Sequence, residues 1–164
     1  MRKIRLLLGL VFLVVACSSS TSLAVGMPLA TGASLQAYLD VQVYRETWAL
    51  YPGKGKLYEP EIPSPHGALL TTYLNEGALQ AIVNKQGALA DGSIIVKENY
   101  MLDGTYAGAT VMYKVRGYDP SNKDWFWAKW DARATIEEEG RVQGCITCHR
   151  SKRDNDFIWT SSLR

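Results

Sequence analysis

The chain has 164 residues and a formal net charge of +2, from 18 Lys and Arg against 16 Asp and Glu. Three of the basic residues precede Ala16 and no acidic residue does, so removing that segment leaves 15 basic and 16 acidic residues. This near-neutral balance gives no electrostatic basis for binding nucleic acid, and the length fits a single domain.

The N-terminal segment is typical of an export signal, with a basic start and an apolar run from Leu6 to Val15. The run is shorter than the about 20 apolar residues that cross a bilayer. We predict a signal peptide of the lipoprotein type at residues 1–16, because Val14-Val15-Ala16-Cys17 resembles a lipobox, in which the cysteine becomes the lipidated N-terminus. Cys17 would then hold the protein at the outer membrane, on its periplasmic side. Cleavage after Ala24 is the alternative, and it would release a soluble periplasmic protein.

We expect residues 17–32 to form a polar tether and residues 33–164 to form a single domain. Within the domain, Ser34 to Leu50 predicts one amphipathic helix with Ser34 as its N-cap, because apolar side chains recur at helical spacing. Pro52-Gly53 ends this run, and a loop with several prolines follows.

From residue 68 onward the pattern is that of β-structure. Asn75 predicts the N-cap of a short helix that extends to about Gln86, and in residues 109–116 apolar and polar side chains alternate between two faces. The predicted strands are Ala68–Leu74, Ser93–Met101, Ala109–Tyr118 and Asp124–Trp130. The expected fold class is α+β, mainly β: an antiparallel sheet with an N-terminal helix, a short helix and a C-terminal helix.

The C-terminal helix is assigned to haem because Cys145, Cys148 and His149 form a Cys-x-x-Cys-His motif, the pattern for covalent attachment of c-type haem. On a helical turn both sulfurs lie on one face and can reach the two vinyl groups of one porphyrin, and His149 can bind the iron as proximal ligand. A zinc site would need further ligands, but the chain's other cysteine is Cys17 and its other histidine is His66. A dithiol redox site is expected near the start of a βαβ unit, not near the C-terminus.

Export and haem attachment support each other, because c-type haem is attached outside the bacterial cytoplasm. If Cys17 carries lipid and the motif carries haem, no thiol remains for a disulfide. The sequence therefore predicts one covalent haem c. The candidates for the sixth position on the iron are Met101, Met112, His66 and Lys97, and a Met or His there would give a low-spin electron carrier.

Six motifs follow one another along the chain: Pro65-His66-Gly67, Thr72-Tyr73-Leu74-Asn75, Asp91-Gly92-Ser93-Ile94-Ile95-Val96-Lys97-Glu98, Asp124-Trp125-Phe126-Trp127, Cys145 to His149, and Asp156-Phe157-Ile158. In this order they resemble those of the cytochrome P460 family, which includes the β-sheet cytochromes c′ (cytochrome c′-β). The resemblance covers roughly residues 48–160. The resemblance implies an antiparallel β domain with one c-type haem, often as a homodimer, and an open or weakly occupied distal site.

The resemblance also implies roles for individual residues. Lys97 occupies the position at which cytochromes P460 carry a lysine bonded covalently to the haem, although family members without this cross-link exist. The alternative is a lysine at the sheet edge that pairs with a haem propionate or with Glu98. By motif position, Glu98 and Asp124 are candidate proton acceptors. Candidates to line a ligand pocket are Ile94, Val96, Trp125, Phe126 and Trp127, and candidates to meet the propionates are Arg150, Lys152 and Arg153.

We therefore expect an exported monohaem c-type cytochrome that binds small nitrogen ligands (NO, hydroxylamine) or CO at an accessible iron. Redox conversion of hydroxylamine or NO, with a periplasmic redox partner, would extend this function to an enzyme. The alternatives are a plain electron-transfer cytochrome c and a haem-free exported binding protein with an incidental Cys-x-x-Cys-His motif.

Overall fold

The computed structural model describes residues 26–61 and 64–164. The predicted signal peptide, Cys17 and most of the predicted tether lie outside these residues. Within them, no helix is both long enough and apolar enough to span a bilayer.

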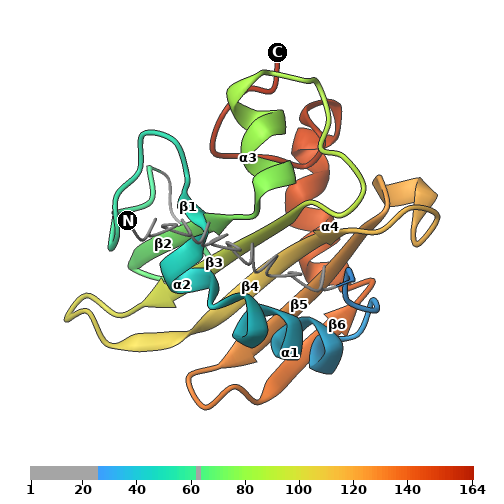
Figure 1. Cartoon of the computed structure of the whole chain (residues 1–164). Coiled ribbons are helices and arrows are strands. Elements are labelled where there is room, and N and C mark those ends of the chain that lie inside the picture. Colours follow the sequence, from blue (N-terminus) through green and yellow to red (C-terminus); the bar gives the residue numbers. More distant parts are fainter. Residues whose placement is uncertain (1–25, 62–63) are drawn as a thin grey trace, which may run out of the picture.

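The fold is built on one six-stranded antiparallel sheet in which the strands follow one another in chain order (Figure 1). Consecutive strands pair side by side; the first two are joined by residues 51–68, and the second and third by a segment that contains a short helix. The strands are β1 (Ala49–Leu50), β2 (Leu69–Leu74), β3 (Ile94–Tyr100), β4 (Tyr106–Lys114), β5 (Trp125–Asp131) and β6 (Ile136–Gly140). This architecture confirms the expected α+β, mainly β class.

The sheet separates two apolar layers. On one face α1 (Gly32–Gln42) packs through Leu35 and Leu39 against side chains of β2 to β5. On the other face lie α3 (Glu76–Val83), α4 (Gln143–His149) and the C-terminal chain (Figure 1). The predicted alternation along residues 109–116 is confirmed, because Val111 belongs to the first layer and Met112 to the second.

The prediction of one helix from Ser34 to Leu50 is wrong. Helix α1 ends where Val43 adopts the left-handed conformation, with φ 47°, and a short helix α2 (Tyr44–Thr47) leads into β1. The cap of α1 is Thr31 rather than Ser34, since the Thr31 side chain accepts a hydrogen bond from the Ser34 amide. The bend at Val43 is accompanied by a long-range contact that helical spacing does not reveal: the Tyr44 hydroxyl donates to the buried Glu98 carboxylate of β3.

The four predicted strands correspond to β2, β3, β4 and β5, whereas β1 and β6 were not predicted. β6 was not predicted, because its Ile-Glu-Glu-Glu-Gly sequence lacks alternating apolar residues; pairing with β5 forms it. Strand β4 runs from Tyr106 to Lys114 rather than from Ala109 to Tyr118. Gly108 has φ 131°, and a Cβ there would collide with the Trp130 carbonyl oxygen, so the close approach of β5 requires a glycine.

Helix α3 begins at the cap that the sequence predicts. The Asn75 Oδ1 accepts from the Ala78 amide at 3.1 Å and from the Ile94 amide at 2.9 Å, and its Nδ2 donates to the Gly92 carbonyl at 2.8 Å. One side chain therefore starts α3 and fixes the turn that leads into β3.

We expect Asn75→Ala to lower the free energy of unfolding by about 2 kcal/mol, because it removes a helix cap and leaves two further backbone groups of the turn without a partner. Asn84→Ala is the matched control. Asn84 lies at the other end of α3 and bonds only the exposed Gln80 side chain, so its loss should cost about 0.5 kcal/mol or less. Urea denaturation followed by tryptophan fluorescence measures both, and equal costs would contradict this role of Asn75.

Candidate functional site

Helix α4 carries the Cys-x-x-Cys-His motif and packs in the apolar layer that also contains α3 and the C-terminal chain. Ile146 and His149, three residues apart, are buried against the sheet layer. Cys145 is half-buried and Cys148 is exposed, and both are free thiols. Packing of this helix thus leaves both cysteines and the buried imidazole in the lining of one cavity.

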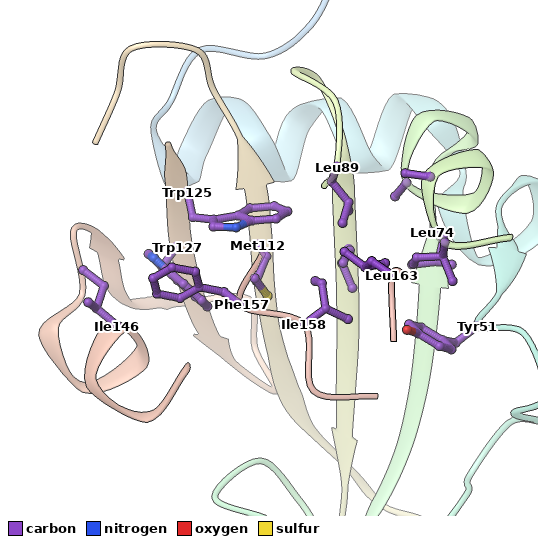
Figure 2. Close-up of a cluster of buried hydrophobic side chains, with 14 of the residues drawn as sticks. Tyr51, Leu74, Leu89, Met112, Trp125, Trp127, Ile146, Phe157, Ile158 and Leu163 are labelled. Carbon is purple, nitrogen blue, oxygen red and sulfur yellow. The ribbon is translucent and has the colours of Figure 1, made fainter. Parts of the chain in front are cut away.

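A cavity of about 400 Å³ opens beside this helix, within the range of ordinary ligand sites. An adjoining hollow of about 460 Å³ shares His66, Lys97, Cys148 and His149 with it. Met112 and Trp127 come from β4 and β5, and Phe157 and Ile158 from the C-terminal chain that crosses in front of the sheet (Figure 2). The lining includes Ile95, Lys97, Asn99, Thr110, Met112, Trp127, Cys145, Cys148, His149 and Phe157.

His149 is held as a neutral imidazole with one nitrogen available. Its Nδ1 lies 2.8 Å from the Phe157 carbonyl oxygen, which can only accept, so Nδ1 carries the proton and Nε2 keeps a lone pair. Burial lowers the pKa of His149 to about 4; the Phe157 carbonyl opposes this shift and Lys97 adds to it. This is the arrangement that a metal-binding histidine requires, with the second ring nitrogen fixed by a protein acceptor.

The chain that supplies this carbonyl is held by a buried ion pair. Asp156 and Phe157 both have positive φ angles, 51° and 67°, which are unfavourable for residues other than glycine. The Asp156 carboxylate accepts from Lys114 Nζ at 2.6 Å and from the Leu89 amide at 2.8 Å. The Trp125 indole donates to the Asp156 carbonyl at 3.1 Å. Alternation along β4 could have shown that Lys114 faces this layer, but its partner forty-two residues later could not be inferred from spacing.

Lys97 of β3 points into the cavity without a partner. Its ammonium forms neither a hydrogen bond nor an ion pair with any residue that the structure describes, although the side chain is largely buried. Burial lowers its pKa to about 8, and Cys148 partly opposes the shift. A fraction of Lys97 is therefore an unprotonated amine at neutral pH, the form that acts as a nucleophile or a ligand.

His66 lies in the loop before β2 and also faces the cavity. Its Nδ1 is 3.1 Å from the Thr110 hydroxyl of β4, and its ring centre is 6.3 Å from that of His149. Burial, with a contribution from Lys97, lowers the pKa of His66 to about 3. Of the other candidates for the sixth position, Met112 lines the cavity, whereas Met101 is 57% exposed and is not among the lining residues.

The structure does not bring Glu98 into the cavity. Successive residues of a strand point to opposite faces, so Glu98 lies in the other layer from Lys97. There its carboxylate accepts from the Tyr44 hydroxyl at 2.8 Å, from Arg45 Nε at 2.5 Å and from the Tyr100 hydroxyl at 2.6 Å.

Other predicted site residues are also placed by strand parity and by loop contacts. Trp127 lines the cavity, and Trp125 is buried in the same layer. Ile94, Val96 and Phe126 belong to the opposite layer, and Ile95 lines the cavity in place of Ile94 and Val96.

Among the charged candidates, Asp124 accepts a hydrogen bond from the Asp119 amide, outside the cavity. Arg150 and Arg153 bind Asn122 and Ser121, whereas Lys152 lines the adjoining hollow.

The residues present fit a haem. One wall offers two thiols and the free imidazole nitrogen of His149, and apolar side chains from β3 to β5 line the opposite wall. Two buried polar atoms, Asn99 Oδ1 and Trp127 Nε1, have no hydrogen-bond partner within the described chain, and both residues line the cavity. Such orphaned atoms are uncommon in a complete interior, so a polar ligand or water is expected to meet them.

Comparison with known proteins identifies a family. The sequence model of the family described as Cytochrome P460 matches residues 49–160. A search of curated proteins finds no match. The matched region begins at β1 and ends after the carbonyl of Phe157, so it contains every cavity-lining residue discussed above.

The two buried lysines predict opposite effects on the stability of the haem-free protein. Lys97→Met should raise the free energy of unfolding by about 1–3 kcal/mol at pH 7, because it removes a buried charge without a partner. Lys114→Met should lower it by about 3 kcal/mol, because Asp156 would remain buried and unpaired. Chemical denaturation measures both.

The pH dependence provides a further check on Lys97. Its pKa falls from 10.5 in the unfolded chain to about 8 in the folded protein, so the unfolded chain binds more protons between these values. The stability of the wild type should therefore rise with pH across this window, and the advantage of Lys97→Met should shrink there. A constant advantage from pH 7 to pH 10 would contradict a buried Lys97 charge.

Glu98→Gln should lower the free energy of unfolding by about 1–3 kcal/mol, since three donors lose a charged acceptor. It should leave the absorption spectrum of the haem-loaded protein unchanged, because the carboxylate lies on the other side of the sheet. A change in ligand-binding rates comparable with that of a cavity variant would show that Glu98 acts at the site.

Proposed function

The chain belongs to the cytochrome P460 family, which makes it a haem-binding cytochrome, and we propose that it is a monohaem c-type cytochrome that binds NO, CO or hydroxylamine. Haem supplies an iron that takes such ligands at the position opposite its protein ligand. The observation that carries the proposal is the hydrogen bond from His149 Nδ1 to the Phe157 carbonyl, which leaves Nε2 free beside two thiols at the wall of a cavity.

The two cysteines attach the group. Each of Cys145 and Cys148 would hold the group by adding its S–H across one vinyl double bond, which forms one C–S bond and one C–H bond without a net change in oxidation state. Burial and Glu138 raise the pKa of Cys145 to about 11, which keeps it a thiol at neutral pH until it reacts. His149 is the proximal ligand, oriented by Phe157 and by the ion pair beneath it.

Lys97 acts at the haem edge or on the distal side in this proposal. Burial lowers the pKa of its unpaired amine, and the charge of Lys97 contributes to the lowered pKa values of His66 and His149. A covalent cross-link through Lys97 remains part of the proposal, as an outcome that intact-mass measurement decides.

Ligand binding is favoured over oxidation of hydroxylamine. Oxidation also releases protons, which need an acceptor near the ligand. Glu98 lies in the opposite layer, and among the described residues the carboxylate that lines the cavity is Glu138 of β6, which is exposed. An enzymatic role would therefore depend on Glu138 or on water rather than on the residue that motif position suggested.

Export belongs to the same proposal. The pattern of residues 1–16 and the attachment of haem outside the cytoplasm support a periplasmic location, with Cys17 as a lipid anchor and a periplasmic redox partner. Homodimer formation is supported by membership of the family alone.

The test uses the full chain expressed with a cytochrome c maturation system. The wild type should stain for covalent haem on a denaturing gel, and Cys145→Ala combined with Cys148→Ala should not. Cys17→Ser is the matched thiol control: it should keep the haem and move the protein from the membrane to the soluble fraction. Colourless wild-type protein at the mass of the bare polypeptide would contradict the proposal.

The same preparation tests the ligand and Lys97. The ferrous protein should form CO and NO adducts, which absorption spectroscopy detects; a spectrum that neither gas changes would identify a plain electron-transfer cytochrome instead. An intact mass equal to polypeptide plus haem excludes the Lys97 cross-link, and a further loss of hydrogen that Lys97→Met abolishes would establish it.

A further inference from the structure

Two histidines face the same cavity, and each ring is held through its Nδ1. His149 is fixed through Nδ1 by the Phe157 carbonyl at 2.8 Å, and His66 is fixed through Nδ1 by the Thr110 hydroxyl at 3.1 Å. The Thr110 hydroxyl can donate or accept, so His66 Nε2 has a lone pair for a metal in the tautomer in which Nδ1 donates to Thr110. In each ring Nε2 is the nitrogen that has no hydrogen-bond partner among the residues the structure describes. Both residues line the cavity and the adjoining hollow.

The separation of the rings suits two ligands of one metal ion. A metal–imidazole bond is about 2 Å long and the ring centre lies roughly 1 Å behind the bonded nitrogen, so two imidazoles on opposite sides of one ion have centres roughly 6 Å apart. The centres of His66 and His149 are 6.3 Å apart. The rings are inclined by 74°, which such binding permits because each imidazole can rotate about its own metal–nitrogen bond.

The loop that carries His66 is anchored to the sheet. The Ala68 amide donates to the Tyr100 carbonyl at 3.0 Å, and the His66 amide donates to the Ser64 hydroxyl at 3.2 Å. A Cβ at Gly67 would lie 2.9 Å from the Tyr100 backbone nitrogen, so only a glycine allows the loop to approach β3 this closely. His66 is thus presented to the cavity by a fixed backbone.

The other candidates are less suited to the sixth position. Met112 rises from the centre of the sheet as part of the packed layer (Figure 2). Lys97 would have to release a proton before its amine could bind iron, and no hydrogen bond to a described residue holds that amine in place, whereas Thr110 holds the His66 ring. Met101 is exposed at the turn between β3 and β4.

We propose that His66 is a displaceable sixth ligand of the haem iron, on the side opposite His149, and that NO or CO binds only by replacing it. This inference rests on the proposed haem site and adds a regulatory residue to it. His149 is carried by a helix and backed by the Asp156–Lys114 ion pair, whereas His66 is carried by a loop and backed by one threonine hydroxyl. The weaker support identifies His66 as the ligand that leaves.

The experiment compares haem-loaded wild type, His66→Ala, Thr110→Val and Lys97→Met by absorption and electron paramagnetic resonance spectroscopy, and by stopped-flow mixing with CO. The wild type should be low-spin and six-coordinate. His66→Ala should be high-spin and bind CO about tenfold faster or more, because the open state no longer has to form first. Free imidazole should restore the low-spin spectrum of His66→Ala.

The two remaining variants test the support of His66 and the competing ligand Lys97. Thr110→Val keeps the His66 ring and removes its hydrogen bond, so it should give a mixture of high-spin and low-spin protein. Lys97→Met should remain low-spin. A low-spin spectrum that Lys97→Met abolishes and His66→Ala preserves would assign the position to Lys97 and overturn the proposal.

Other outcomes separate this inference from the function on which it rests. A wild type that holds covalent haem but is high-spin overturns the role of His66 and leaves the haem site intact. The pyridine haemochrome assay measures the haem content of each variant, so a loss of haem in His66→Ala is distinguished from a change in ligation. If no variant holds haem, both proposals fail together.

Discussion

The site depends on one hydrogen bond, from His149 Nδ1 to the Phe157 carbonyl. It fixes the tautomer and the orientation of the imidazole, so that Nε2 rather than Nδ1 faces the cavity. The acceptor lies in a strained turn, which Asp156, Lys114 and Trp125 hold in place through contacts from two other strands. Thus the sheet, the helix that carries the thiols and the C-terminal chain all act together on one side chain.

Two neighbouring charged residues of β3, Lys97 and Glu98, have different roles because they lie on opposite faces of the sheet. Lys97 and its neighbour Glu98 point to opposite faces, because side chains alternate along a strand. Glu98 is satisfied by three donors and stabilises the junction between α2 and the sheet. Lys97 has no such partner among the described residues, and its burial lowers stability in the haem-free protein. A residue that costs stability in this way is expected where chemistry requires it.

Much of the fold could be predicted from local patterns. The Cys-x-x-Cys-His helix, the cap at Asn75 and the alternation around Met112 depend on residues close in sequence, and the structure contains all three elements. The break at Val43 and strand β6 could not be predicted, because both depend on partners far along the chain. Within the site, the alternation of side chains along β3 could have predicted that Ile95 shares the face of Lys97 and that Glu98 does not. The prediction for Glu98 was wrong because it relied on motif position and ignored this alternation. The separation between His66 and His149 requires coordinates.

The acceptor of the His149 hydrogen bond affects how readily an iron bound to this histidine would take up an electron. A backbone carbonyl carries no formal charge, so it draws the imidazole proton less strongly than a carboxylate would. The ring then keeps its neutral character and donates less electron density through Nε2. Reduced iron is favoured over oxidised iron when its axial imidazole is a weaker donor. A haem bound through His149 would therefore be biased toward its ferrous state.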